Sequence, residues 1–200
     1  PDDIEASYHA LVSAVLAAWG SEDVAELSSL APDIVLHDAA PLLVPVQLRR
    51  YGYVAERVVA GRKVAWHAGS SLRCEGEGEV IAAGRYFAGA DKRHGTSALT
   101  DALLQFKHDD APAPELARIL ELVIDNWYDD RPIVIASVPP KPGQTRNRFA
   151  ALFDELEPVL PKGVRVVRDA LTCLREIPNY RSLGRPARKA AVRGAYESAY

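Results

Sequence analysis

The stretch Ile133-Val134-Ile135-Ala136-Ser137-Val138 decides the fold class, because it is a continuous apolar run rich in β-branched residues. A run of this kind, without polar residues at alternate positions, is typical of a strand that is buried on both faces in a parallel sheet. Prolines and a glycine follow within residues 139–143 and end the run. We therefore predict that residues 131–138 form a buried strand in the centre of a parallel sheet.

Segments with the helical period of apolar residues precede and follow this strand in the sequence. Apolar residues at helical spacing predict helices over residues 97–107, 116–127 and 147–157. A second strand is predicted over Val164-Arg165-Val166-Val167. Strand, loop, helix and strand make one βαβ unit, whose crossover should be right-handed. The pattern predicts an α/β protein, with a partial parallel sheet flanked by helices in residues 96–200.

Residues 1–95 have a different pattern of apolar residues. Helical spacing predicts one helix over Asp3–Trp19 and a short second helix that begins at Ser21. From residue 33 to residue 89, short apolar runs are broken by glycines, and a hairpin is expected to turn at Ala60-Gly61. We interpret residues 1–95 as a small α+β region that precedes the α/β region of residues 96–200.

Composition limits the classes of function. The chain has 200 residues, 48% hydrophobic and 26% charged, as an ordinary globular protein has. Its net charge of -3 argues against non-specific nucleic-acid binding by the whole chain. The sequence has neither a signal-peptide pattern nor an apolar run of about 18 residues, so we expect a cytoplasmic protein with no membrane contact. Cys74 and Cys173 form no Cys-x-x-Cys pair, which excludes a zinc ribbon, and both should be free thiols.

The loop after the apolar strand is the first candidate site. It contains three cations within eight positions, and it leads into a predicted helix, whose N-terminus favours anions. Ligands of open α/β sheets bind beyond the carboxyl ends of the strands. We predict a diphosphate site here; the alternative is a set of solvated charges that keep the edge of the sheet soluble. The predicted ligands are the side chains or backbone amides of Lys141, Gly143, Gln144, Thr145, Arg146 and Arg148.

A second basic segment lies near the C-terminus. Residues 182–196 contain three arginines and a lysine, and Arg181 precedes them. Such a run can contact phosphates, and it can equally be an exposed basic helix. No Gly-x-Ser-x-Gly, Walker or His-Glu-x-x-His motif is present, and the five histidines have no ligand spacing. We therefore assign no catalytic residue and no metal ligand from the motifs alone.

The order of these elements resembles the ComF-like branch of the type I phosphoribosyltransferase fold. In that family a helix with a phenylalanine–lysine pair, here Phe106-Lys107, precedes a strand that ends in Val-Pro, here Val138-Pro139. A helix with arginine and phenylalanine follows, here Arg146 and Phe149. A basic hood then ends in arginine–glycine–aromatic, which matches Arg193-Gly194-Ala195-Tyr196. The resemblance covers about residues 97–200.

The resemblance implies a sheet of phosphoribosyltransferase type and a protein that binds phosphoribosyl diphosphate or a nucleotide-like ligand. Lys141 and the amides after it would hold diphosphate, which Mg²⁺ would bridge in an active transferase. The hood, with Arg181, Arg185 and Arg188, would close over the other substrate. The family's zinc finger is missing from residues 1–90, and residues 1–200 do not contain its acidic ribose loop. Three functions therefore stay open. The protein is a glycosyltransferase, or it is a non-catalytic binding module that serves DNA uptake, repair or stress response. The third alternative is an interaction domain that uses the N-terminal half.

Overall fold

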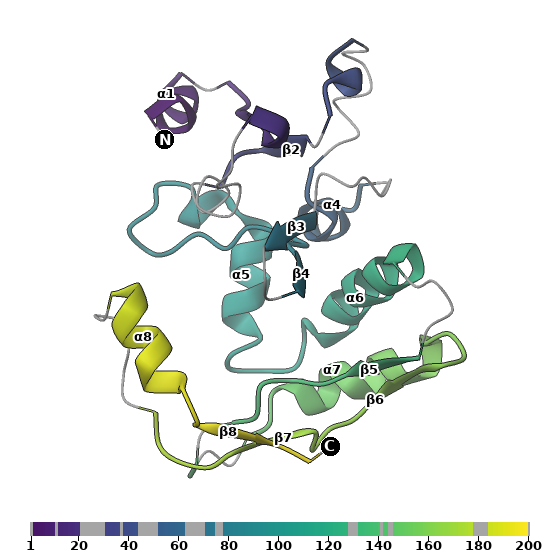
Figure 1. Ribbon diagram of the computed structural model, residues 1–200. Coiled ribbons are helices and arrows are strands. Elements are labelled where there is room, and N and C mark those ends of the chain that lie inside the picture. The colour runs from purple at the N-terminus through teal and green to yellow at the C-terminus, as the bar shows by residue number, and fades with distance from the viewer. Residues whose placement is uncertain are drawn as a thin grey trace.

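Short strands, paired two by two, alternate with helices along the chain in the computed structural model (Figure 1). The structure describes residues 2–10, 12–20, 31–36, 38–43, 52–62, 71–74, 78–127, 132–140, 142–143, 146–177 and 184–199. Helix α1 and the C-terminal strand lie at opposite ends of the molecule, with the long helices between them. The α/β class predicted from the sequence is therefore confirmed, and in the described residues each sheet has two strands.

The N-terminal part begins with helix α1 (Asp2–His9), which is much shorter than the helix predicted over residues 3–19. That prediction is wrong because residues 15–17 are extended and form strand β1 (Val15–Ala17), parallel to strand β2 (Ile34–Leu36). Leu16 and Val35 are buried together in a small core, so pairing with a distant strand outweighs the local helical period. The 3-10 turns η1 (Ala18–Gly20) and η2 (Ala40–Leu43) follow these strands. The short helix predicted from Ser21 lies outside the described residues.

The hairpin expected at Ala60-Gly61 is also wrong. Residues 54–59 form helix α4 (Val54–Val59), and the two residues form the turn that ends it. Gly61 has a φ of 62°, and its amide donates to the Val58 carbonyl at 2.8 Å. A glycine in the left-handed region is a common helix ending, because it carries no Cβ to oppose that conformation. The antiparallel pair in this region comes later, from β3 (Ser71–Cys74) and β4 (Gly78–Ile81).

The main core lies between the helices in the middle of the molecule. The turn η4 (His94–Thr96) precedes helix α5 (Ala98–Gln105), whose first turn is capped by the Ser97 hydroxyl. Helices α6 (Ala113–Trp127) and α7 (Phe149–Leu156) pack against each other and share one core with α5, so the three predicted helices are confirmed. The core also takes in residues of α4, on the other side of the expected boundary at residue 95. The core residues are Val54, Ala55, Leu99, Phe106, Ala113, Leu116, Ala117, Ile119, Leu152 and Leu156.

Strand β5 (Ile133–Ile135) pairs in parallel with β6 (Val164–Val166), and α7 and the turn η5 (Glu157–Val159) lie between them in the chain. The predicted βαβ unit is therefore present. Its first strand is shorter than predicted and is not buried on both faces, because Val134 is 48% exposed and Val138 is 61% exposed. Ile135 packs against the helical core. The prediction of a central strand is wrong for the described chain, where this sheet has two strands and only one face is covered by helices.

The C-terminal part consists of an antiparallel pair, β7 (Leu171–Cys173) and β8 (Tyr196–Ser198), with helix α8 (Arg185–Val192) between them in the chain. Cys173 is a free thiol, as predicted, and its Sγ lies 3.3 Å from the Arg175 carbonyl. Cys74 lies in β3, and its side chain is outside the described part of the structure. None of the helices described is long and apolar enough to cross a bilayer.

Candidate anion site

The predicted diphosphate loop is described in part. Lys141, Gln144 and Thr145 lie outside the described residues. Gly143 has a φ of 83°, a left-handed conformation that suits glycine, in the turn after β5. Arg146 and Arg148 follow, just before α7 begins. The loop thus connects a strand's carboxyl end to a helix N-terminus, as predicted.

Of the hood residues that the resemblance implies, Arg185 and Arg188 are described only as backbone. Arg185 begins α8, and Arg188 lies one turn further along the same helix. Their side chains, and the whole of Arg181, are outside the described part of the structure. In Figure 1, α8 lies on the side of the molecule away from α6. The role of these arginines therefore stays a prediction.

Arg146 connects the loop to the end of α5. Its Nη1 donates to the Lys107 carbonyl at 3.0 Å, and its Nη2 forms an ion pair with Asp110. Because Asp110 partly neutralises its charge, Arg146 can contribute less to anion binding than a cation without a carboxylate partner. Its hydrogen bond instead holds the backbone of Lys107 beside the predicted loop, 39 residues along the chain.

Two other cations lie beside this connection, and they form what we call the basic rim (Lys107 and Arg148). The ammonium of Lys107 lies 3.3 Å from the Tyr86 hydroxyl and 5.0 Å from the centre of its ring. The guanidinium of Arg148 lies 4.9 Å from the centre of the Phe149 ring. Among the residues that the structure describes, neither cation has a carboxylate partner, although five arginines do. Those five are Arg85, Arg93, Arg118, Arg146 and Arg168.

The basic rim lines a cavity of about 620 Å³, which we call the apolar cavity. Its wall consists of residues 82–84, both α5 and α6, and the first turn of α7. Among the described residues that line it, all except the basic rim and Tyr86 are glycine or have a hydrocarbon side chain. These lining residues are Ala55, Ala82, Ala83, Gly84, Leu99, Leu103, Phe106, Leu116, Ile119, Leu120, Phe149 and Leu152.

Aromatic contacts fix the wall of the cavity next to the rim. The rings of Phe106 and Phe149 meet edge to face with their centres 6.1 Å apart, and Phe149 stacks on Phe153 at 6.3 Å. Both geometries are favourable for aromatic pairs. The phenylalanine–lysine pair and the arginine–phenylalanine helix are two elements of the resemblance, and the structure brings Phe106 and Phe149 into contact. Sequence reasoning missed Tyr86, whose segment shows no period that would reveal it.

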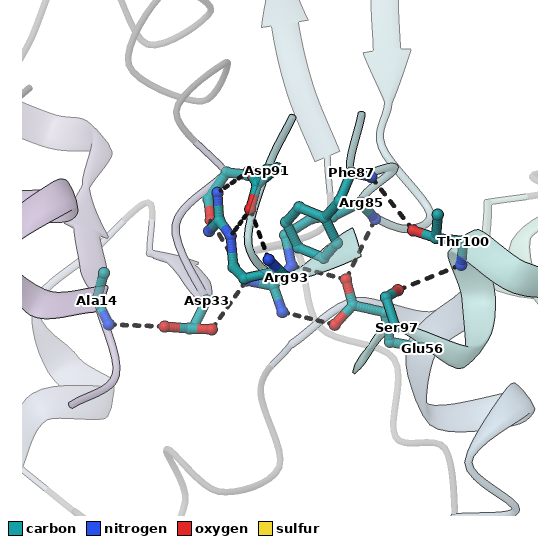
Figure 2. A network of polar contacts seen from close by, with 10 residues as sticks. Ala14, Asp33, Glu56, Arg85, Phe87, Asp91, Arg93, Ser97 and Thr100 are labelled. Atoms are coloured by element: carbon teal, nitrogen blue, oxygen red, sulfur yellow. Dashed lines mark hydrogen bonds and ion pairs between the residues drawn. The ribbon is translucent and has the colours of Figure 1, made fainter. Parts of the chain in front are cut away.

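Figure 2 shows a second polar cluster, which contains Arg85 and Phe87. These two residues alternate along the chain with Gly84 and Tyr86, which line the apolar cavity. Arg85 binds both carboxylate oxygens of Glu56 at 2.7 Å and one oxygen of Asp33 at 2.8 Å. Burial lowers the pKa of Arg85, but the hydrogen bonds to the two carboxylates outweigh burial and raise it above the ordinary value. Asp33 also accepts from the Ala14 amide at 2.8 Å, so this cluster joins the N-terminal strands to α4.

Arg93 completes this cluster, which we call the arginine network (Asp33, Glu56, Arg85, Asp91 and Arg93). Its guanidinium donates to both oxygens of Asp91, at 3.0 and 2.8 Å, and these bonds lower the pKa of Asp91 to about 2. Both arginines also lie against the Phe87 ring, within 5.4 Å of its centre. Every cation of the network has a carboxylate partner, so we assign it a structural role.

The described residues have no cluster of metal-ligating side chains. They contain no group of three His, Cys, Asp or Glu side chains placed to hold a metal ion. Asp110, the carboxylate beside the predicted loop, is paired with Arg146. Mg²⁺ therefore stays a prediction that follows from the resemblance, in which the diphosphate itself would supply ligands.

Comparison with known proteins assigns no family. No family model, no curated protein and no solved structure matches the chain. The resemblance to ComF-like phosphoribosyltransferases thus rests on the quoted motifs alone.

Proposed function

We propose that this protein is phosphoribosyltransferase-like and binds a small phosphorylated ligand at the basic rim and the adjoining loop. One observation carries the proposal. Lys107 and Arg148 have no carboxylate partner among the described residues. Arg148 lies where the loop of a parallel strand enters α7, and Lys107 lines the same cavity. An anion would supply the negative charge that these two cations lack. Lys141 and the amides from Gly143 to Thr145 would add contacts from the loop, as the sequence predicts.

The two rim cations suit the two ends of a diphosphate. Arg148 can donate two parallel hydrogen bonds to one phosphate group, whereas Lys107 acts as a compact point charge. Each charge-assisted bond contributes roughly 1.5–3 kcal/mol before the cost of association. Two or three such bonds give a dissociation constant in the high micromolar to millimolar range. Binding should therefore be weak and sensitive to salt.

In a transferase of this type, the group esterified to the diphosphate would be transferred to a second substrate, with release of diphosphate. Lys107 and Arg148 would stabilise the charge that develops on the leaving diphosphate, which is catalysis by positioning and electrostatics. The predicted hood, with Arg181, Arg185 and Arg188, would close over the second substrate. The role of the hood follows from the resemblance, whereas the role of Lys107 and Arg148 is proposed from their place at the cavity.

Titration with inorganic diphosphate, followed by NMR, tests the binding. We expect shifts in residues 106–108 and 142–150, and loss of binding in the Lys107→Ala, Arg148→Ala double variant. A Lys141→Ala, Arg146→Ala double variant should also bind more weakly, because it removes the loop's cations. Arg118→Ala is the matched control, since Arg118 is paired with Glu121 on the exposed face of α6. Shifts confined to α8, or binding that survives both double variants, would contradict the proposed site.

A further inference from the structure

The apolar cavity limits what the ligand of the basic rim can be. Each rim cation is the chain neighbour of an aromatic wall residue: Lys107 follows Phe106, and Arg148 precedes Phe149. An anion on the rim therefore lies directly beside a hydrocarbon wall. A ligand that occupies both places has a charged head and an apolar body joined by a short link.

We infer that the ligand is a phosphate or diphosphate ester of an apolar alcohol, of the prenyl or aryl kind. This inference rests on the proposed function, because it assumes that the phosphate binds at the basic rim. The cavity of about 620 Å³ lies within the usual range for small-molecule sites, which is about 300–1,000 Å³. It has room for a body of several carbon atoms.

The chemistry of the wall argues against a sugar or a nucleobase as the buried part. Away from the rim, Tyr86 is the one described lining residue with a polar side chain, and its hydroxyl is already 3.3 Å from the Lys107 ammonium. The Ala83 carbonyl is also engaged, since it accepts from the Ala55 amide at 2.8 Å. A ribose or a base would bury several donors and acceptors against this wall without partners, and each unpaired group is costly. A hydrocarbon body has no such groups.

The wall is held in place without a ligand. Leu99, Phe106, Ile119 and Leu152 are each at most 5% exposed and belong to the main core. The edge-to-face contact of Phe106 and Phe149 fixes the aromatic part beside the rim. A ligand therefore meets a largely preformed surface, which lowers the cost of ordering side chains on binding.

A set of ligands that differ only in the body tests the inference by calorimetry or NMR titration. The probes are inorganic phosphate, inorganic diphosphate, ribose 5-phosphate, isopentenyl diphosphate and uncharged isopentenol. We expect isopentenyl diphosphate to bind at least tenfold more tightly than inorganic diphosphate, because about 0.8 kcal/mol is gained for each CH₂ that is buried. Ribose 5-phosphate should show no gain over inorganic phosphate, and isopentenol alone should bind too weakly to measure.

Two cavity variants locate the apolar body. Ala83→Leu fills the cavity and leaves the rim charges, so it should remove the tenfold advantage and keep the binding of inorganic diphosphate. Leu103→Gln, which places an amide on the wall, should reduce the advantage in the same way if Ala83→Leu fails to fold. Ala98→Leu, an exposed change at the start of α5 outside the cavity, is the control and should bind as the natural chain does.

The outcomes separate this inference from the proposed function. Isopentenyl diphosphate and inorganic diphosphate could bind with equal affinity, and the Lys107→Ala, Arg148→Ala double variant could lose the binding of both. That result would overturn the inference and leave the proposed function standing. Isopentenol that binds as tightly as its diphosphate would also overturn it, since the anion would then contribute nothing. If no phosphorylated probe binds, both fail. A tenfold advantage that survives Ala83→Leu and Leu103→Gln would place the apolar body elsewhere and overturn the assignment to this cavity.

Discussion

The arginine network and the basic rim both adjoin the same short segment, residues 82–87, and use their cations in opposite ways. In the network, Arg85 and Arg93 are saturated by carboxylates and lie against one aromatic ring. At the rim, Lys107 and Arg148 also lie against aromatic rings, but no described carboxylate meets them. Paired cations join parts of the chain, whereas unpaired cations remain available to a ligand. The comparison predicts that changes in the network will reduce stability, and that changes at the rim will reduce binding.

The largest effect is expected from Arg85→Met, which keeps much of the side-chain volume and removes the charge. Its side chain is only 14% exposed, and its loss leaves Glu56 and Asp33 without their cation. Removing one partner of a buried ion pair costs about 3 kcal/mol or more of unfolding free energy. Urea unfolding should show this loss, and Arg85→Lys should recover only part of it, because lysine cannot bind Glu56 through two parallel bonds.

The control for this prediction is Arg118→Ala, which removes an exposed ion pair within one helix. Such pairs contribute about 0.5 kcal/mol or less. If Arg85→Met lowers the unfolding free energy no more than Arg118→Ala does, the arginine network does not stabilise the fold as we describe.

Gly84→Ala should have the next largest effect, because Gly84 lies between the network and the cavity. An added Cβ would lie 2.9 Å from the Ala55 Cβ and 2.3 Å from Leu99 Cδ2. The leucine can rotate, but the Ala55 Cβ is fixed to the backbone of α4, so the two segments must separate. Overpacking of this kind costs about 1–3 kcal/mol. The loss should appear in thermal or urea unfolding.

Gly89→Ala is the matched control, since nothing lies within 4 Å of a Cβ there and its φ is not in the left-handed region. It should leave the unfolding free energy nearly unchanged. A Gly84→Ala variant as stable as Gly89→Ala would mean that α4 and residues 82–84 are not packed closely.

Local periodicity predicted the helices around α5, α6 and α7 and the βαβ unit, because the apolar positions there repeat with the helical or strand period. It failed for the strand over residues 131–138, since burial of a strand's second face depends on distant parts of the chain. It failed again at residues 15–17, where pairing with β2 replaced a helix. The same limit applies to the site. Phe106-Lys107 could be chosen from its motif, but its contacts with Tyr86 and Arg146 span 21 and 39 residues.

A smaller effect, visible only in acid, is expected from the Asp91–Arg93 pair. The hydrogen bonds from Arg93 lower the pKa of Asp91 from 3.8 to about 2. A carboxyl with a lowered pKa stabilises the fold above its ordinary pKa, and that stability is lost as the pH falls toward the lowered value. Between pH 4 and pH 2, the natural chain should therefore lose this part of its stability, whereas Asp91→Asn should lack it throughout. Urea unfolding at several pH values measures the difference, and parallel curves for the two proteins would contradict it.

The smallest effect on stability is expected at the basic rim, and it completes the comparison. Lys107→Ala and Arg148→Ala break no described ion pair, so each should change the unfolding free energy by no more than about 0.5 kcal/mol. Removing one of two neighbouring like charges can even stabilise the free protein slightly. Inorganic diphosphate should nevertheless raise the Tm of the natural chain, because a ligand that binds only the folded state stabilises it. The same concentration should not raise the Tm of the double variant. Either single variant could lose more than about 1 kcal/mol of unfolding free energy while diphosphate still raises its Tm as it does for the natural chain. The rim would then have a structural role like that of the network, and the contrast between the two regions would be wrong.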